Sequence, residues 1–453
     1  YIRRCFGLTW RRPSTGTWPL SSVWGAELLP WFSPPESDIT IYEKNDNISF
    51  LSCGIALNVG KVIEDTESLF YNSPENLAKL GVVTNMKHEV LDIDFENKTL
   101  KVKNLITEEV FEDNYDKLVL TLGSWPIVPR FEGGELENIV LCKNHDHALN
   151  IIEKSKDAKN VVIIGAGYIG VELVEAFEMQ GKNVTLIDAE KRIMAKYLDK
   201  DFTDVAEKEF SDRGVKLVLG EKVQKFNGEN GKVTEVITEN GTYQGDLVVL
   251  CIGFAPNTKL VQGKLDTLPN GAIIIDEYMR TSKEDVFAAG DCCVVTYNPA
   301  KDTRYIPLAT NAVRMGTLVA RNIVKPTLKY MGTQGTSGIK IYEQNIASTG
   351  MTEEVAKATT KMNIATVSLT DNYRPEFMPT YEPATIKIVY DADTRRVLGG
   401  QIISKVDLTQ FMNTLSVVIQ NDMTIEELAM TDFFFQPHYN KPWSLLNAVA
   451  LKA

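Results

Sequence analysis

The stretch that decides the fold is Val161-Val162-Ile163-Ile164-Gly165-Ala166-Gly167-Tyr168-Ile169-Gly170-Val171-Glu172. Its four leading apolar residues predict a buried strand, and the glycines that follow predict a turn into a helix. Gly165 permits the tight turn, Gly167 lets the backbone approach a ligand closely, and Gly170 allows the helix to pack on the strand. This pattern is typical of a unit that holds the pyrophosphate of a dinucleotide at a helix N-terminus.

An acidic residue further along supports the dinucleotide interpretation. Asp188 lies eighteen residues after Gly170, at the end of a second predicted strand over residues 183–188. A carboxylate in this position binds the 2′-hydroxyl of a ribose and repels a 2′-phosphate. The sequence therefore predicts NADH rather than NADPH, and the alternative is a glycine turn that holds no ligand.

Strands and helices alternate on both sides of this unit. The alternation indicates a parallel sheet that is covered on both faces. After Pro326 the pattern changes to longer antiparallel strands and amphipathic helices, which indicates a separate α+β domain. The predicted strands are 39–43, 115–121, 160–164, 183–188, 216–219, 233–238, 246–252, 281–291, 385–390 and 398–404, and the predicted helices are 74–80, 168–177, 201–213, 309–324, 408–420 and 424–430.

Length and composition limit the class of protein. A chain of 453 residues suggests about two to four domains. A net charge of −12 and a pI of about 5.1 argue against nucleic acid or an anionic membrane surface as a partner. The longest apolar run, residues 247–255, is too short to span a bilayer. Six cysteines in a chain of this size do not form a disulfide framework, so we expect a reducing, cytoplasmic compartment.

Cys53 is a single cysteine within an apolar run over residues 49–57. If this run opens a helix, the positive end of the helix dipole and its free amides favour the thiolate. No second cysteine follows within a turn or two, so a dithiol/disulfide cycle within the segment is excluded. The redox interpretation is a reversible cycle between thiolate and sulfenic acid, and the alternative is a buried structural cysteine.

A second ligand site is indicated by Asp291, which follows Ala288-Ala289-Gly290 at the end of a predicted strand. An acid placed there reaches the ribityl or phosphate part of a nucleotide. A loop acid that caps the next helix is an equally good interpretation of the spacing alone.

These motifs together resemble the pyridine nucleotide-disulfide oxidoreductase superfamily, whose members carry a central NADH motif like residues 165–170 and an Ala-Ala-Gly-Asp that contacts FAD. The segment around Cys53 resembles the single-cysteine branch, which contains NADH oxidases, NADH peroxidases and coenzyme A-disulfide reductases. The resemblance covers about residues 38–451. The segments that resemble the water-forming NADH oxidases most closely are 305–314, 371–378 and 433–443.

The resemblance implies an α/β fold with two Rossmann-like nucleotide-binding domains plus a C-terminal α+β interface domain. It implies an FAD-binding domain over residues 1–120 and 276–325, an NADH-binding domain over 121–275 and a dimerisation domain over 326–453. It also implies a homodimer that takes O₂, or H₂O₂ in a peroxidase, as its substrate. No metal, nucleic acid or membrane is expected.

The resemblance further implies the site residues. Cys53 is the expected catalytic residue. Glu43 is expected to bind the adenosine ribose of FAD, Val90 to contact its adenine through the backbone, and Phe434 to approach the flavin of the partner subunit. The rest of the expected FAD shell is Thr121, Leu122, Gly123, Ser124, Lys143, Asp291, Leu308, Ala309 and Thr310, and the expected NADH contacts are Gly165, Gly167, Tyr168, Ile169, Gly170, Asp188, Tyr197 and Gly253.

Some of these residues also fit ordinary structural positions. The alternative interpretation of Val90 and Leu308 is an ordinary residue of the protein core. The alternative for Lys143 and Tyr197 is an ordinary surface residue.

Three further residues invite a chemical role that we do not favour. His438 has no dithiol to protonate, so we expect a surface or interface histidine. Cys292 and Cys293 are adjacent and would pair only with strain, so we expect small core residues.

Residues 1–37 depart from the family pattern. Members begin with a strand and a glycine-rich turn for the FAD pyrophosphate, and they place a histidine in that turn. Here no histidine precedes His88, and prolines interrupt every candidate element, so we predict no strand or helix in residues 1–35. Our hypothesis is an out-of-frame or otherwise corrupted reading of the normal start. A flavin-free dimeric binding protein is therefore the alternative from another functional class.

The implied reaction is the reduction of O₂ to water. NADH passes hydride to FAD, and the reduced flavin reacts with O₂ to give a flavin hydroperoxide or bound peroxide. Cys53 thiolate attacks its terminal oxygen, releases water and becomes a sulfenic acid, which a second reduced flavin returns to thiolate. Four electrons per O₂ demand two NADH. NADH peroxidase is the close rival. Coenzyme A-disulfide reductase is less favoured, because Ser52 stands where those members usually carry asparagine.

Overall fold

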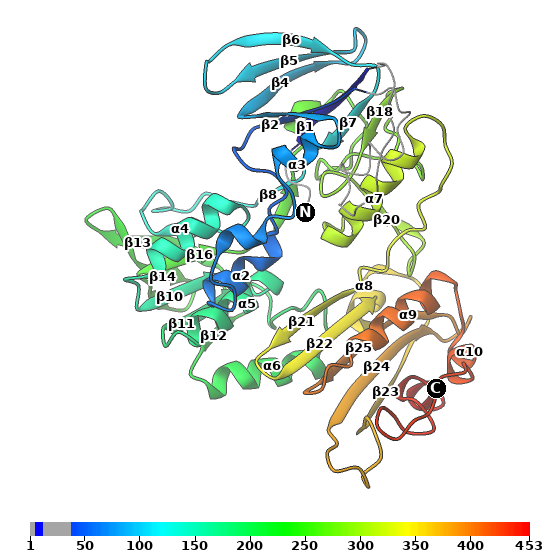
Figure 1. Cartoon of the computed structure of the whole chain (residues 1–453). Helices are drawn as coiled ribbons and strands as arrows, with labels where there is room; N and C mark the ends of the chain where they lie inside the picture. Colours follow the sequence, from blue (N-terminus) through cyan, green and yellow to red (C-terminus); the bar gives the residue numbers. More distant parts are fainter. Residues whose placement is uncertain (1–4, 12–37) are drawn as a thin grey trace.

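The computed structural model describes residues 5–11 and 38–453 of the chain. Figure 1 shows three units, each centred on a sheet: a first unit at the top, a second unit in green at the left, and a C-terminal unit in yellow to red at the lower right. Within the described residues, no helix is both long enough and apolar enough to cross a membrane.

The first unit is centred on a five-stranded sheet in the order β18-β7-β1-β2-β3. β2 pairs with β3 in parallel, and β7 pairs with β18 in parallel. An antiparallel sheet, β4-β5-β6, lies above it in Figure 1. The elements are β1 (Cys5–Arg11), β2 (Asp38–Glu43), α3 (Pro74–Ala78), β3 (Val82–Met86), β4 (His88–Asp94), β5 (Thr99–Asn104), β6 (Val110–Asn114), β7 (Leu118–Thr121), β18 (Val286–Ala288), β19 (Val295–Tyr297), β20 (Asp302–Arg304) and α7 (Ala309–Asn322).

Strand β1 shows that the prediction of no strand in residues 1–35 was wrong. β1 lies between β2 and β7 and runs antiparallel to both. Without it, both neighbours would present a row of unpaired backbone groups, and any extended segment satisfies such groups whatever its side-chain pattern. Sequence periodicity therefore misses a strand of this kind. Residues 1–4 and 12–37, on which the hypothesis of a corrupted start mainly falls, lie outside the described residues.

The second unit is a parallel sheet, as predicted, and its strand order is β12-β11-β10-β16-β9. Along β10, Val161 and Ile163 pack into one core while Val162 and Ile164 pack into another, so both faces of the sheet are covered. The elements are β9 (Ile139–Leu141), α4 (His145–Ser155), β10 (Asn160–Ile164), α5 (Tyr168–Glu178), β11 (Asn183–Asp188), α6 (Lys200–Asp212), β12 (Lys216–Leu219), the antiparallel β13 (Val223–Glu229), β14 (Lys232–Thr238) and β15 (Thr242–Gln244), and β16 (Leu247–Leu250).

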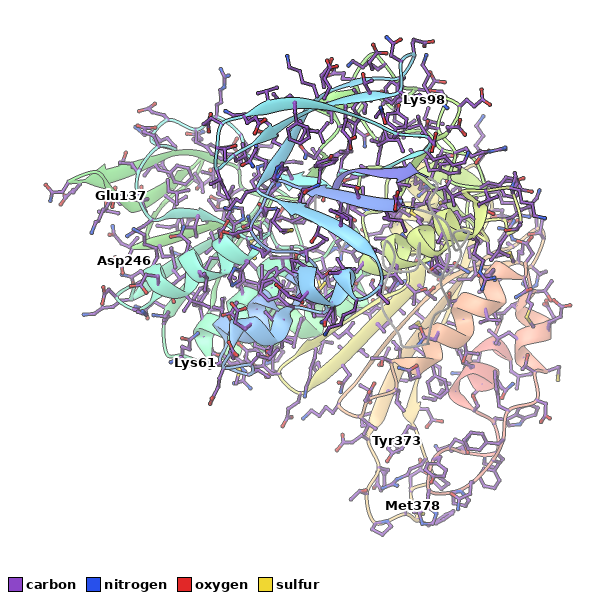
Figure 2. The ribbon with its side chains drawn as sticks, turned by 45° about the horizontal axis from the view of Figure 1, so that its top comes forward. Lys61, Lys98, Glu137, Asp246, Tyr373 and Met378 are labelled. Atoms are coloured by element: carbon purple, nitrogen blue, oxygen red, sulfur yellow. The ribbon has the colours of Figure 1, made fainter. Side chains whose placement is uncertain are left out.

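The C-terminal unit is an antiparallel sheet in the order β21-β22-β25-β24-β23, packed against helices. The loop between β23 and β24 carries Tyr373 and Met378 at the far end of the molecule (Figure 2). The elements are β21 (Ser337–Ile341), β22 (Gln344–Gly350), α8 (Glu353–Thr359), β23 (Ile364–Asn372), β24 (Pro383–Asp391), β25 (Val397–Ser404), α9 (Gln410–Gln420), α10 (Ile425–Ala429) and α11 (Leu445–Ala450).

Short elements connect the first and second units. β8 (Ser124–Pro126) pairs with β17 (Phe254–Pro256), and α2 (Ile55–Val59) shares a core with α5, beside which it lies in Figure 1. The 3₁₀ turns are η2 (Ser52–Gly54), η3 (Thr66–Leu69) and η4 (Lys259–Val261). Of the strand predicted over residues 281–291, only β18 forms. Residues 281–285 instead make a turn in which Lys98 and Lys117 bind the Asp285 carboxylate.

Candidate functional site

The glycine turn of the second unit has the geometry that a dinucleotide requires. Gly165 has φ +109°, and a Cβ there would overlap the carbonyl oxygen of Cys251. A Cβ at Gly170 would overlap the carbonyl oxygen of Gly165, so helix and turn are in close contact. A Cβ at Gly167 would meet no described atom within 4 Å. The turn thus leaves open space at Gly167, in front of the N-terminus of α5.

Asp188 is anchored beside this turn. One carboxylate oxygen accepts the backbone N–H of Ala166 at 2.5 Å, and the other accepts the N–H of Glu190 at 2.7 Å. Each oxygen has a second lone pair. The carboxylate is therefore held in place by the backbone and keeps the capacity to accept hydroxyl donors from a ligand.

Two tyrosines lie next to the glycine turn. The rings of Tyr168 and Tyr197 are 4.7 Å apart between centroids and inclined at 50°. The Tyr168 hydroxyl is 2.7 Å from the Ser337 hydroxyl of the C-terminal unit. Burial raises the pKa of Tyr168, which therefore stays a neutral hydroxyl. Ile169 lies on the same turn of α5, and Gly253, with φ +102°, follows β16, so both lie near the carboxyl ends of the parallel strands.

A buried polar network lies where the first and second units meet. The Lys143 ammonium donates to the Ser124 hydroxyl at 3.0 Å and to Asp291 at 3.2 Å, and Ser124 donates to the same carboxylate oxygen at 2.8 Å. Lys143 is only 3% exposed, so the surface position considered for it is wrong. Its ammonium also lies 4.2 Å from the centre of the Phe254 ring.

This network retains an acceptor for a ligand. Asp291 Oδ1 is buried and has no hydrogen-bond partner among the residues that the structure describes, and the same is true of the Tyr305 hydroxyl. An unsatisfied buried carboxylate oxygen is costly, so a donor from a bound group fits there. The sequence did not reveal Tyr305 and Phe254, since a tyrosine or phenylalanine in a loop carries no sequence signal.

The remaining FAD candidates lie in the first unit and near its edge. Glu43 ends β2, is fully buried, and accepts the backbone and side-chain N–H groups of Asn45, both at 2.7 Å. Val90 is a buried residue of β4. Further candidates are Thr121 and Leu122, buried at the end of β7, Gly123 in a turn with φ +66°, and Leu308, Ala309 and Thr310, at the start of α7.

Cys53 lies in η2, directly before α2, and its side chain is exposed. Ser52 donates its hydroxyl to the carbonyl oxygen of Lys143 at 2.9 Å. This bond ties the cysteine turn to the Lys143 network, although ninety-one residues separate the two partners. The predicted helix start is correct, but α2 has only five residues, so less of a helix dipole acts on Cys53 than we expected.

The C-terminal candidates and the other cysteines lie elsewhere. Phe434 is 68% exposed and meets Tyr439 edge to face, and His438 is exposed. Cys292 and Cys293 are buried free thiols with sulfur atoms 3.5 Å apart, as expected of core residues. The described residues contain no group of three or more metal-ligating side chains.

Glu172, on α5, is a titratable group that the sequence did not single out. Burial and, to a smaller extent, the charge of Glu175 raise the pKa of Glu172 to about 7. An acid on a helix is usually a solvated surface residue, so no sequence signal marks it.

We expect Glu172→Gln to flatten the pH dependence of stability. The folded pKa of about 7 lies above the ordinary value of 4.5, so the folded state keeps a proton that the unfolded state releases. The stability that Glu172 contributes is fully present below pH 4.5 and is lost as the pH rises through 7, which lowers the free energy of unfolding by about 3 kcal/mol. Denaturant unfolding at pH values between 4.5 and 7 and on either side of this range measures the slope of the free energy of unfolding against pH. The control is Glu64→Gln, because Glu64 is exposed. An unchanged slope in Glu172→Gln would exclude Glu172 as its source.

Comparison with known proteins agrees with this geometry. The family described as pyridine nucleotide-disulphide oxidoreductase matches residues 33–316, and the dimerisation domain of that family matches residues 336–445. The chain is 55% identical over 420 residues to the NADH oxidase of Enterococcus faecalis, covering 92% of this chain and 94% of that protein. It is 42% identical over 431 residues to the NADH oxidase of Streptococcus pyogenes, with the same coverage.

Solved structures give the same result. The water-forming NADH oxidase from Lactobacillus brevis, bound to NADH, is 51% identical, covers 94% of each chain and superposes with a TM-score of 0.92. The predicted fold class is therefore confirmed: an α/β fold with two Rossmann-like domains plus a C-terminal dimerisation domain. The chain belongs to the pyridine nucleotide-disulphide oxidoreductase family.

Proposed function

We propose that the chain is an FAD-dependent NADH oxidase that reduces O₂ to water. The observation that carries the proposal is the hydrogen bond from Ser52 to the Lys143 carbonyl, because it ties the turn that carries Cys53 to the residue whose ammonium pairs with Asp291. The relatives support the same reaction: two are NADH oxidases, and the L. brevis protein is a water-forming one with NADH bound.

NADH would bind at the carboxyl edge of the parallel sheet in the second unit. The open space at Gly167 and the amides at the start of α5 would receive the pyrophosphate. Asp188 would accept the ribose hydroxyls with its remaining lone pairs and would repel a 2′-phosphate. Tyr168 and Tyr197 would border the nicotinamide end.

FAD would be held between the first and second units. Glu43 and Val90 would hold the adenosine end, and Asp291 Oδ1 would accept a hydroxyl of the ribityl chain. Lys143 provides a fixed positive charge at this site, which is balanced by Asp291. When bound, FAD supplies hydride acceptance and the reaction with O₂.

Cys53 would carry the second half of the reduction. Its thiolate attacks the terminal oxygen of peroxide, the O–O bond breaks, and one oxygen leaves as water after protonation while Cys53 becomes a sulfenic acid. Two further electrons and a proton reduce the sulfenic acid to thiolate and release the second water. Two NADH therefore supply the four electrons that one O₂ requires.

The C-terminal unit would pair two copies of the chain. Its surface exposes a group of large aromatic side chains around the β23–β24 loop and the segment before α11 (Figure 2). Exposed apolar groups of this kind mark an interface. We infer a homodimer in which Phe434 approaches the flavin of the partner subunit. The members of the group are Phe377, Tyr381, Phe434, Phe435, Tyr439 and Trp443.

We also infer a reducing, cytoplasmic setting. Cys251, Cys292 and Cys293 are free thiols, which an oxidising compartment would expose to pairing or oxidation.

The deciding experiment measures flavin and stoichiometry on the purified chain. We expect yellow flavin absorbance and, with an oxygen electrode, two NADH consumed per O₂ without accumulation of H₂O₂. One NADH per O₂ with accumulating H₂O₂ would refute the four-electron reaction. Faster NADH oxidation with H₂O₂ than with O₂ would identify a peroxidase. A colourless protein would refute every enzymatic interpretation.

A further inference from the structure

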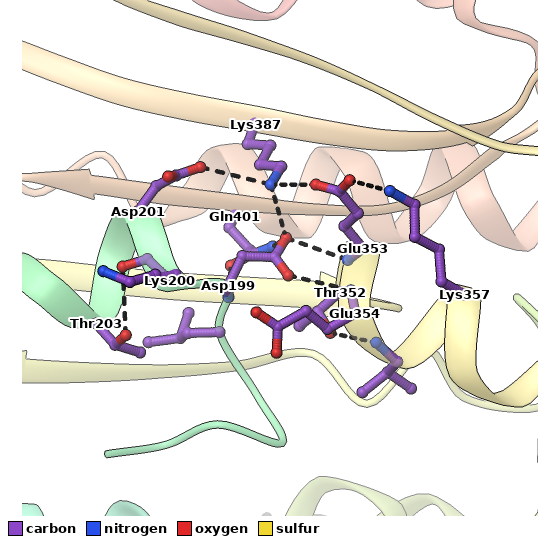
Figure 3. Close-up of polar contacts among 12 residues, drawn as sticks. Asp199, Lys200, Asp201, Thr203, Thr352, Glu353, Glu354, Lys357, Lys387 and Gln401 are labelled. Carbon is purple, nitrogen blue, oxygen red and sulfur yellow. Dashed lines mark hydrogen bonds and ion pairs between the residues drawn. The ribbon is translucent and has the colours of Figure 1, made fainter. Parts of the chain in front are cut away.

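A buried ionic cluster joins the second unit to the C-terminal unit. We call Asp199, Lys387, Glu353 and Gln401 the Asp199 cluster (Figure 3). Asp199 is the residue directly before α6 of the second unit, whereas the other three belong to β24, α8 and β25 of the C-terminal unit. Asp199, Lys387 and Gln401 are all buried. The cluster therefore links two sheets that are remote in sequence.

Asp199 uses its backbone N–H and both carboxylate oxygens in this contact. Its backbone N–H donates to Gln401 Oε1 at 2.6 Å, and Gln401 Nε2 donates back to the carboxylate at 2.7 Å. The carboxylate also accepts the backbone N–H groups of Glu353 and Glu354 at 3.1 and 3.3 Å. Such a reciprocal set of bonds fixes the direction of the chain at Asp199 as well as its position.

Lys387 supplies the positive charge of the cluster. Its ammonium lies 3.2 Å from Asp199, 2.7 Å from Glu353 and 3.5 Å from Asp201. Taking such charges out of water costs free energy, and a well-packed apolar contact would stabilise the interface equally well. The cluster is therefore better explained by the geometry that it imposes than by the stability that it adds.

The geometry is passed on to the NADH candidates through a short chain of backbone bonds. Tyr197 and Leu198 donate their N–H groups to the carbonyl oxygen of Met194 at 2.8 and 3.1 Å. Met194 in turn donates its N–H to the carbonyl oxygen of Ala166, inside the glycine turn, at 2.7 Å. Leu198, whose N–H binds the Met194 carbonyl, directly precedes Asp199 in the chain. A movement at Asp199 would therefore move the Tyr197 ring.

The C-terminal unit holds the facing tyrosine as well. The Tyr168 hydroxyl is hydrogen-bonded to Ser337 of β21. Tyr342, in the turn after β21, also contacts α5: its N–H donates to Glu175 at 2.9 Å and its hydroxyl donates to Glu178 at 2.7 Å. Both rings that border the nicotinamide candidate site are thus fixed by the same sheet.

We propose that Gln401 and Lys387 of the C-terminal unit are positioning residues for NADH, because through Asp199 they set the place of Tyr197 opposite Tyr168. Neither residue touches the glycine turn or the candidate nicotinamide site. The proposal rests on the proposed function for the identity of the ligand, whereas the link between the cluster and the Tyr197 segment is independent of it.

Two variants of the holoenzyme test the proposal. Gln401→Leu removes the reciprocal bonds of Asp199, and the charge-balanced Lys387→Met/Glu353→Gln removes the ammonium together with one negative charge. The matched control is Lys405→Met/Glu343→Gln, since this pair is an exposed Lys–Glu ion pair of the same unit, 3.1 Å long.

The measurements are hydrogen exchange of peptides that cover residues 189–199 and the concentration dependence of anaerobic flavin reduction by NADH. We expect faster exchange in these peptides, an apparent Kd for NADH raised about tenfold, and an unchanged rate of reoxidation by O₂. The control variant should change none of the three.

Two results separate the possible failures. Unchanged exchange over residues 189–199 and an unchanged Kd, with only a lower melting temperature, would overturn the proposal and leave the cluster a plain interface contact. A wild-type holoenzyme that NADH does not reduce would instead overturn the proposed function, and the exchange data would still decide whether the cluster holds the Tyr197 segment.

Discussion

Cys53→Ser is expected to change the NADH:O₂ stoichiometry from two to one and to make the enzyme release H₂O₂. The NADH and FAD candidates are untouched by this change, so the two-electron reduction of O₂ should continue. A serine hydroxyl is a far weaker nucleophile than a thiolate at neutral pH, so peroxide would leave before its O–O bond is broken. An oxygen electrode, together with a peroxide assay, measures both quantities in one experiment.

The position of Cys53 separates its expected behaviour from that of the neighbouring cysteine, Cys142. It is an exposed cysteine, on a turn that Ser52 binds to Lys143, whereas Cys142 lies next to Lys143 in the sequence but is buried. Cys142→Ala is therefore the matched control and should keep two NADH per O₂. If Cys53→Ser still forms only water, the second two-electron step does not pass through Cys53, and the sulfenic acid cycle is refuted.

The local parts of the site could be predicted from the sequence. Strand, turn and helix around Gly165 follow from residues that are adjacent in the chain, and β11 and β12 have the predicted bounds. The anchoring of Asp188 beside the turn also follows, because the carboxyl ends of parallel strands meet at one edge of the sheet. In each case the pattern of a short segment determines its geometry.

The parts that could not be predicted depend on residues far apart in the chain. The partners Lys143 and Asp291 are separated by 148 residues, and Asp199 and Gln401 by 202. No periodicity or motif relates such positions, and a lysine or glutamine in a strand or loop is ordinarily a surface residue. β1 was missed for a similar reason, since the edges that it pairs with come from two other segments.

Gly167→Ala is expected to abolish most NADH binding while leaving the fold intact. The residue has φ −79°, which any amino acid adopts, and its Cβ would meet no described atom within 4 Å. The melting temperature should therefore stay close to that of the wild type. The added methyl group would occupy the space in which the pyrophosphate must approach the backbone, so we expect NADH affinity to fall by at least about tenfold. Calorimetric titration and thermal unfolding measure the two quantities separately.

Gly165→Ala is the matched comparison, since it adds the same methyl group two residues earlier. There φ is +109° and the Cβ overlaps the carbonyl oxygen of Cys251, so the turn itself must distort, at a cost of about 3 kcal/mol or more. This variant should lose both stability and NADH binding. If Gly167→Ala binds NADH normally, the pyrophosphate does not lie against this turn. If instead Gly167→Ala loses as much stability as Gly165→Ala, the space at Gly167 is filled in the folded protein. Only the separation of the two effects, with binding lost at residue 167 and folding lost at residue 165, agrees with a turn shaped by one glycine and left open for a ligand by the other.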